Sequence, residues 1–511
     1  LTGSITSVNA EEMMKRNPVN LGQGLQGAAA GVSVIRSSGA PDGGFSIRIR
    51  GVATVNGSSD PLYVVDGVQV GTSIDFLNPN DVESIEILKD ASATAIYGSR
   101  AANGVVLVTT KRGKAGMKPQ LEFSARYGIQ TLNANDFRVL TADEYIRVSK
   151  AACAMSLFTR GSLDYFTKKY VDEAYFNSHI NNSQFDLNTL TDDFYLKDAY
   201  GNGDTDWWDL MTRNAATQDY SIGIRGGSKE SSYSASIYYK DQKGIVKGGN
   251  SKMLGGSFNF DAAVRDIVRF KLDLRATART ANDKDNMIGE ILDMRPDVPA
   301  YKEDGTINEI SYYVKNPLLS LMDTDEAKGR NFSGTLGLEW DIVKGLTFRN
   351  NTGMRYQLYR RELFYGDQSI MGRRSGIYGS IRNTETGSFQ TSNVLTYDKR
   401  FQKKHKVVVQ LGQEFVKRWT RVLESGVSGL PTDEFILGDM SLGTPSVASS
   451  DENYDDNLLS FFARLNYDFT DKYLFSATFR ADGSSKFGKN NKWGYFPSAA
   501  LGWRISEEDF M

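Results

Sequence analysis

Carboxylates are the residues whose types and spacing come closest to a chemical site in this chain. Asp204, Asp206 and Asp209 lie close together, like the oxygen ligands of a calcium loop. That loop needs another ligand two residues on and then glycine, but Trp207 and Trp208 intervene. We therefore interpret the cluster as a solvated acidic loop.

The other reactive residue types form no recognisable catalytic pattern. Adjacent carboxylates such as Asp192 and Asp193 diverge, so they are poor general acid–base pairs. One cysteine, Cys153, leaves no Cys-based zinc site or intrachain disulfide. The dinucleotide-like run 22–27 (GQGLQG) follows a turn-like stretch rather than a strand, so we interpret it as a packing turn. We predict no enzyme, and no catalytic, cofactor-binding or metal-binding residues.

Composition favours a β-rich protein. The 511 residues include 60 Lys+Arg and 62 Asp+Glu, a formal charge of −2 that argues against a nucleic-acid partner. Glycine (49), Phe (27) and Tyr (25) are abundant and proline (11) is scarce, which is typical of many strands joined by turns. No apolar run reaches the roughly 18 residues of a membrane-spanning helix.

Residues 1–116 predict a small mixed α+β domain. Its strands are short and are separated by turn signals such as Asn56-Gly57 and Asp66-Gly67. Helices fit Ala10–Arg16, before Asn17-Pro18, and Ala91–Tyr97, which ends at Gly98. The expected strands are Val32–Ile35, Phe45–Arg50, Leu62–Val65, Ser84–Leu88 and Val105–Thr110.

Residues 117–511 predict long two-faced strands. Phe270, Leu272 and Leu274, for example, alternate with Lys271 and Asp273, the period-2 pattern of a sheet with one apolar face. We expect twelve strands, near 120–129, 217–225, 231–241, 252–262, 267–279, 331–340, 346–357, 387–398, 406–417, 456–468, 472–482 and 495–504.

The connections between these strands favour an antiparallel membrane β-barrel over a soluble sandwich. Short turns such as Thr470-Asp471 alternate with long loops near 130–216, 280–330, 358–386 and 418–455, as they do when the two rims face different compartments. Trp340 and Tyr397 end strands beside turns, as an interfacial aromatic girdle would. Loop aromatics suit ligand stacking, and the alternative is that they pack the loops together. The substrate-binding candidates are Trp207, Trp208, Tyr312 and Tyr313.

The N-terminal domain resembles the plug of TonB-dependent outer-membrane transporters, and more narrowly the SusC/RagA branch of Bacteroidetes. The resemblance rests on 60–67 (DPLYVVDG), on 78–111 (NPNDVESIEILKDASATAIYGSRAANGVVLVTTK) and on 45–51 (FSIRIRG). The early barrel is similar more loosely, through Asp206-Trp207 and 244–246 (GIV).

This resemblance implies a barrel of about 22 strands with the plug (1–116) folded inside it. Twelve strands in 117–511 then suggest that the chain is an internal fragment, lacking the N-terminal TonB box and the later strands. Polar plug residues would bond to the inner barrel wall. The candidates for these contacts are Arg48, Arg50, Asp66 and Arg100.

The function that the resemblance implies is active import of an oligosaccharide or oligopeptide across the outer membrane of a Gram-negative cell. Cargo would bind between the plug and the extracellular loops, without a cofactor. The implied partners are a SusD-like surface lipoprotein as a lid, TonB with ExbB/ExbD, and outer-membrane lipid. Two alternatives are a signalling receptor or adhesin on the same scaffold, and a secreted glycan-active enzyme.

Overall fold

A computed structural model describes residues 5–508 with gaps. No helix of the described part is long and apolar enough to cross a membrane. The residues outside the description are 1–4, 16–17, 19, 37, 42, 52–58, 72–73, 90–94, 133–137, 161–166, 176–194, 197–199, 283, 285–286, 309–315, 435, 489 and 509–511.

The N-terminal domain is built on a five-stranded sheet in the order β1-β6-β7-β4-β5, with β2 and β3 as a separate hairpin. β4 and β7 run parallel, and the other pairs are antiparallel. The elements are β1 (Ile5–Asn9), α1 (Ala10–Met14), α2 (Leu21–Leu25), β2 (Val32–Arg36), β3 (Phe45–Ile49), β4 (Leu62–Val65), β5 (Val68–Gly71), η1 (Pro79–Asp81), β6 (Val82–Leu88), η2 (Ala95–Ala101) and β7 (Val105–Thr110).

A continuous apolar core holds this domain together. Ile85, Ile87 and Val106 are fully buried between the sheet and the short helices. The glycine-rich run forms α2, and an added Cβ at Gly22 would lie 2.4 Å from the ring of Phe45. The run was expected to be a packing turn; most of it is helical instead, although its glycines do allow close packing. The helix predicted over 91–97 begins outside the described residues, and its described part belongs to the 3₁₀ helix η2.

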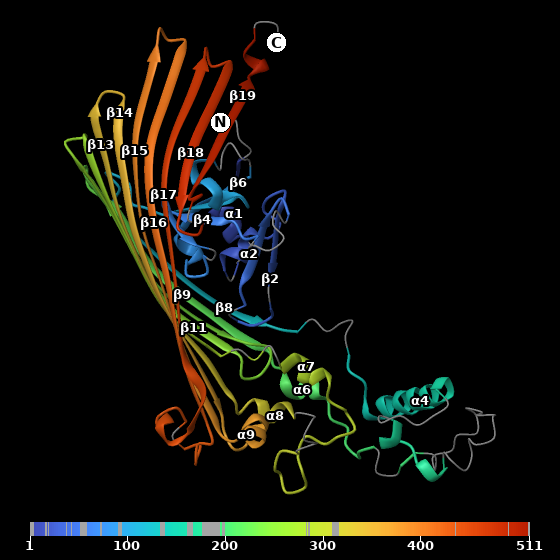
Figure 1. Ribbon diagram of the computed structural model, residues 1–511. Coiled ribbons are helices and arrows are strands. Elements are labelled where there is room, and N and C mark those ends of the chain that lie inside the picture. Colours follow the sequence, from blue (N-terminus) through green and yellow to red (C-terminus); the bar gives the residue numbers. More distant parts are fainter. Residues whose placement is uncertain are drawn as a thin grey trace.

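The described part of residues 117–511 forms one antiparallel sheet of twelve strands, each paired with its neighbours in chain order (Figure 1). The predicted number of strands is confirmed. β8 and β19 are the two edges, so the sheet is open. The strands are β8 (Gln120–Gln130), β9 (Ala215–Gly227), β10 (Ser231–Lys243), β11 (Asn250–Val264), β12 (Val268–Asn282), β13 (Thr324–Val343), β14 (Leu346–Tyr365), β15 (Tyr378–Phe401), β16 (His405–Ser428), β17 (Thr444–Phe469), β18 (Tyr473–Ser484) and β19 (Trp493–Trp503).

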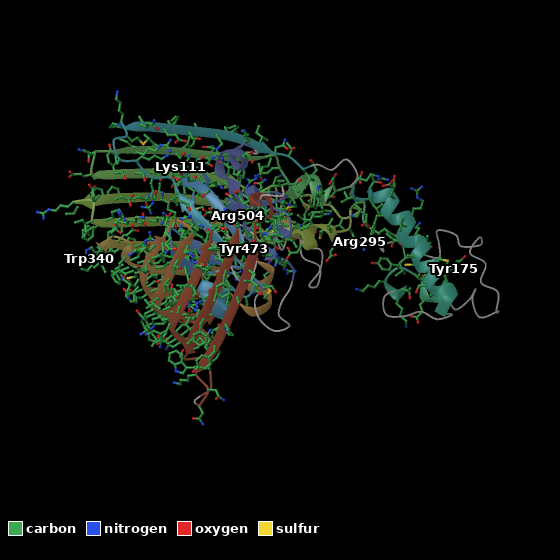
Figure 2. The ribbon with its side chains drawn as sticks, turned by 90° about the horizontal axis from the view of Figure 1, so that it is seen from above. Lys111, Tyr175, Arg295, Trp340, Tyr473 and Arg504 are labelled. Carbon is green, nitrogen blue, oxygen red and sulfur yellow. The ribbon has the colours of Figure 1, made fainter. Side chains whose placement is uncertain are left out.

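The two ends of the sheet differ. Tight turns close one end, and Thr470 and Asp471 take φ values of 58° and 59° there, as a hairpin turn of matching twist requires. The long connections and their helices gather at the other end, and α4 lies away from the strands (Figures 1 and 2). The elements of these connections are α4 (Ala142–Arg160), η3 (Thr167–Lys169), α6 (Trp207–Met211), α7 (Met287–Leu292), α8 (Pro317–Ser320), α9 (Ile370–Ser375) and η6 (Met440–Leu442); η7 (Ile505–Glu507) follows the last strand.

Several strands are longer than the alternation predicts. β14 continues to Tyr365 and β15 begins at Tyr378, so much of the loop expected at 358–386 is strand. β16 and β17 likewise extend into the range 418–455. The prediction was wrong here because these extensions lie beyond the apolar band, where both faces carry polar residues and period 2 disappears.

The two faces of the sheet match the predicted alternation. The convex face carries exposed apolar side chains, such as Ile237, Leu254 and Leu336. The concave face carries polar side chains, and the N-terminal domain lies against it (Figure 1). Asp273 and Arg480, on this inner face, are 2% and 0% exposed. We call this concave face the wall.

A small polar patch interrupts the convex face at β14, β15 and β16. Asn350 donates to Asn393 Oδ1 at 2.8 Å, and Asn393 donates to Gln413 Oε1 at 2.8 Å. Thr352 bonds to Asn350 and Thr391. These side chains satisfy one another, which lowers the cost of placing polar groups on an otherwise apolar face.

Candidate functional site

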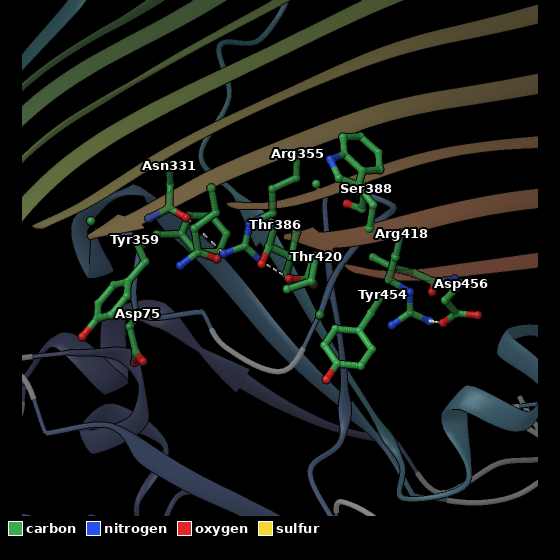
Figure 3. Close-up of a pocket in the computed structure, with 18 of the residues that line it drawn as sticks. Asp75, Asn331, Arg355, Tyr359, Thr386, Ser388, Arg418, Thr420, Tyr454 and Asp456 are labelled. Carbon is green, nitrogen blue, oxygen red and sulfur yellow. Dashed lines mark hydrogen bonds and ion pairs between the residues drawn. The ribbon is translucent and has the colours of Figure 1, made fainter. Parts of the chain in front are cut away.

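The principal cavity lies between the N-terminal domain and the wall, with a volume of about 860 Å³ (Figure 3). The domain contributes β5 and the segment after it, including Gln69, Asp75 and Phe76. The wall contributes strands β11 to β17. A cavity of this size accommodates a molecule of several linked sugar or amino-acid units.

A row of uncharged polar side chains crosses the wall of this cavity. Thr277 pairs with Asn331, and Asn331 pairs with Gln357. The same register continues through Thr386 on β15 and Thr420 on β16 to Tyr454 on β17. Because neighbouring strands are about 4.8 Å apart, the row presents hydroxyl and amide groups at regular intervals over six strands. Such groups donate and accept hydrogen bonds without demanding a charged ligand.

A buried ionic network joins the N-terminal domain to the wall beside the cavity. Arg480 donates to Asp482 Oδ1 at 2.6 Å and to Glu414 Oε2 at 2.7 Å. Arg100 of η2 lies 3.2 Å from the same Glu414 oxygen, and Gln69 donates to its other oxygen at 2.8 Å. Burial, together with the nearby Arg418 and Arg480 guanidinium groups, lowers the pKa of Arg100, and Glu414 opposes this shift. Glu414 is therefore the point at which two side chains of the domain meet the wall.

A second ionic network lies where β7 leaves the N-terminal domain. Arg112 donates to Asp273 at 2.7 Å and to Asp261 at 3.1 Å. Asp66 accepts hydrogen bonds from Arg275 of the wall and from the Thr110 hydroxyl, the latter at 2.8 Å. Burial opposes the charge of Arg112, but Asp273 and Asp66 raise its pKa above the usual value.

A third contact, mostly of uncharged groups, involves η1 and the residues before it. The Tyr238 hydroxyl donates to the Phe76 carbonyl at 2.9 Å, and Asn80 donates to Ser221 at 3.0 Å. Asp81 accepts from the Ser236 hydroxyl at 2.7 Å. Burial raises the pKa of Asp81, and the hydrogen bond from Ser236 partly opposes this shift.

The four residues predicted to contact the wall divide into two pairs. Asp66 and Arg100 lie at the wall, in the two ionic networks. Arg48 lies on β3 of the small hairpin and Arg50 directly follows that strand, and both side chains are exposed. Sequence reasoning missed Glu414, the wall residue that contacts both Arg100 and Gln69. The alternation of polar and apolar residues on its strand predicts only that Glu414 faces inward.

The predicted aromatic residues occupy different surroundings. Trp207 is 2% exposed in a small loop core with Met211 and Ile291, and its indole N–H donates to the Arg295 carbonyl at 2.9 Å. Trp208 packs partly against the same core. Tyr312 and Tyr313 lie outside the described residues.

The acidic loop has structural contacts. Asp206 caps α6 by accepting from the Asp209 amide at 2.9 Å, and Asp204 accepts from the Ala142 amide at 3.0 Å. Across the described part of the chain, no group of three or more His, Cys, Asp or Glu side chains is arranged to hold a metal ion. The arrangement offers a polar molecule hydrogen-bonding groups on the wall, beside the ionic networks that join the domain to the wall.

Comparisons with known proteins agree with this architecture. Residues 1–105 match the family model described as TonB-dependent Receptor Plug Domain, and residues 282–509 match TonB dependent receptor-like, beta-barrel. TonB-dependent receptor P26 of Formosa agariphila is 33% identical over the whole chain and 49% of that relative. TonB-dependent receptor SusC of Bacteroides thetaiotaomicron is 29% identical over the whole chain and 50% of that relative.

A solved structure of the RagAB peptide importer in its closed-closed state has the same fold. It superposes with a TM-score of 0.81 and 26% identity over the whole chain and 58% of that structure's chain. The chain spans about half the length of the curated relatives it matches. Both family models describe receptors rather than enzymes, as the sequence predicts. The chain belongs to the TonB-dependent receptors of SusC/RagA type, with a plug and part of an outer-membrane β-barrel.

Proposed function

We propose that the protein of which this chain is part imports an oligosaccharide or oligopeptide across the outer membrane. The observation that carries the proposal is the cavity of about 860 Å³ between plug and wall, with its row of hydroxyl and amide side chains. The sugar hydroxyls of a glycan and the backbone amides of a peptide both suit such a row. Cargo would enter from the side of the long loops, which is the extracellular side in this account.

Import requires the plug to move relative to the wall, because the plug occupies the concave side of the sheet. The contacts to be broken include the two ionic networks and the hydrogen bonds of Phe76, Asn80 and Asp81. In this proposal TonB, with ExbB/ExbD, supplies the mechanical work. A SusD-like surface lipoprotein closes the cavity from outside, an arrangement supported by similarity to the RagAB importer.

Substitution at Gly329 tests the cavity. Gly329 lines the cavity on β13, and an added Cβ there would meet no atom within 4 Å. Gly329→Trp should therefore place an indole ring in the cavity without a clash at its Cβ. Gly289→Trp, on the exposed surface of α7 and also free of clashes, is the matched control.

The assay uses the full-length receptor and a mixed hydrolysate of pectin and casein. Bound components are identified by mass spectrometry, and their uptake is followed in cells with and without a protonophore. We expect wild type and Gly289→Trp to retain and accumulate the same cargo, and Gly329→Trp to lose both activities. Retention unchanged in Gly329→Trp would contradict the proposed site. Binding without accumulation would favour the signalling or adhesin alternative, and cargo of altered mass would favour an enzyme.

A further inference from the structure

We propose that the cavity recognises a carboxylate on its cargo, through Arg355 and Arg418 of the wall and Arg100 of the plug. This inference rests on the proposed import function and adds a chemical preference to it. All three arginines line the same cavity, and Figure 3 shows the two from the wall.

Arg355 is a half-buried cation whose hydrogen-bond partners among the described residues are all neutral. Its Nη1 donates to the Val70 carbonyl, and its Nη2 lies 3.5 Å from Asn331 Oδ1. Its guanidinium carbon lies 4.6 Å above the ring of Phe76. Arg355 forms no ion pair with any described carboxylate, although an arginine carries five N–H donors. A half-buried positive charge with neutral partners gains more from an anionic ligand than a fully exposed charge does.

Arg418 is placed to share such a ligand. Arg355 on β14 pairs with Ser388 on β15, and Ser388 pairs with Arg418 on β16. The two arginines therefore start about 10 Å apart, two strand spacings, with one hydroxyl between them. Long arginine side chains from these positions can converge on a single oxyanion.

Arg418 also has unused donor capacity. Its Nε is buried and has no hydrogen-bond partner among the described residues. Its ion-pair partner, Asp456, lies 3.6 Å away and is shared with Lys486 at 3.5 Å. Asp456 is therefore shared by two cations, so it neutralises neither of them fully.

Arg100 brings the plug into the same subsite. Its Nε and Nη2 are buried, and neither donates a hydrogen bond to a described residue. Its ion pair with Glu414 is 3.2 Å long and is the plug's charged contact with the wall at this point. An oxyanion bound by Arg418 and Arg100 would compete with Glu414 for Arg100. Cargo binding would thereby weaken one of the contacts that hold the plug in place.

The test measures anion preference on the full-length receptor with the same pectin and casein hydrolysates. These contain uronate-bearing and neutral oligosaccharides, and acidic and neutral peptides, so the bound fraction also reveals whether the anion belongs to a glycan or a peptide. The readout is the enrichment of anionic over neutral components of equal length. We expect at least about ten-fold enrichment, the size of one charge-assisted hydrogen bond in a buried site.

Arg355→Gln removes the charge but keeps an amide donor for the Val70 carbonyl, so the enrichment should fall to about two-fold or less while the plug stays seated. Arg355→Lys should keep most of the preference. Arg418→Gln is a second, independent variant with the same expected loss. Arg330→Gln, an exposed position on β13 outside the cavity lining, is the control that should change nothing.

The outcomes separate this inference from the proposed function. Neutral components retained as well as anionic ones, and lost in Gly329→Trp, would overturn the anion preference and leave import standing. An anion preference unchanged in both Arg355→Gln and Arg418→Gln would also overturn it. Retention of nothing by the wild-type receptor would contradict both proposals.

Discussion

Glu414→Gln should loosen the plug without disrupting the barrel. Glu414 is buried and serves three partners: Arg480 of the wall at 2.7 Å, and Arg100 and Gln69 of the plug at 3.2 and 2.8 Å. Glutamine has the same shape and retains one acceptor oxygen. Its amide group, however, would face two guanidinium groups and leave Arg100 without its charged partner.

The structure sets the size of this effect. Removing one partner of a buried ion pair costs about 3–5 kcal/mol. Part of that cost falls on the barrel itself, where Arg480 still bonds to Asp482 at 2.6 Å. We therefore expect about 3 kcal/mol at the plug–wall contact, or roughly a hundred-fold increase in local plug opening.

Hydrogen exchange on the full-length receptor in nanodiscs measures this opening. The informative amides are those of η2 and of Gly104, whose N–H donates to the Ala101 carbonyl at 2.9 Å. Glu424→Gln is the matched control on the same strand, because its ion pair with Arg382 is partly exposed and is worth at most about 1 kcal/mol. Equal exchange in the two variants would refute the account of Glu414.

Three further perturbations test other plug–wall contacts. Gly98→Ala should speed proteolysis of the plug more than Gly27→Ala: both glycines have positive φ, but only at Gly98 would the new Cβ lie 2.4 Å from Asp482 and 2.5 Å from Arg480. Arg112→Gln should lower the free energy of unfolding by about 3–5 kcal/mol, because it leaves buried Asp273 without its partner at 2.7 Å. Arg138→Gln, which neutralises an exposed pair with Glu144, should leave that free energy almost unchanged. Burial raises the pKa of Asp81 when the plug is seated, so seating should be strongest at acidic pH and weaken as the pH rises through that pKa. Hydrogen exchange at residues 79–82, corrected for intrinsic rates, measures this pH dependence. The dependence should disappear in Asp81→Asn. Each contact has an outcome that would contradict it. For Arg112 it is lower stability of Arg138→Gln than of Arg112→Gln, and for Gly98 it is equal proteolysis of the two alanine variants. For Asp81 it is a pH dependence of exchange that is unchanged in Asp81→Asn.

The parts of the fold that were predictable from the sequence are those where one face meets lipid. Phe270, Leu272 and Leu274 face outward on β12 as their alternation predicts, because each inward neighbour is polar. Beyond the apolar band this constraint vanishes. The outer ends of β14 and β15, where Tyr365 stacks on Tyr378 at 5.8 Å, were therefore expected to be loop.

For the site, the sequence predicts only which face of the sheet each residue lies on. Alternation indicates that Glu414, Arg418 and Arg480 face inward, but not which plug residues meet them. Gln69 and Glu414 are 345 positions apart, and no local pattern records their contact. Trp207 was expected on a loop, and only the three-dimensional structure shows that it lies in the core formed by α6 and α7.

A reversible disulfide between plug and wall tests the central claim most directly. An added Cβ at Gly353 on β14 would lie 3.4 Å from the Cβ of Val68 on β5, close to disulfide geometry. The full-length receptor with Val68→Cys, Gly353→Cys and Cys153→Ala would be assayed for uptake of its own cargo. If import requires the plug to leave the wall, oxidation stops uptake and a reductant restores it. Uptake at the wild-type rate with the disulfide fully formed would contradict the account.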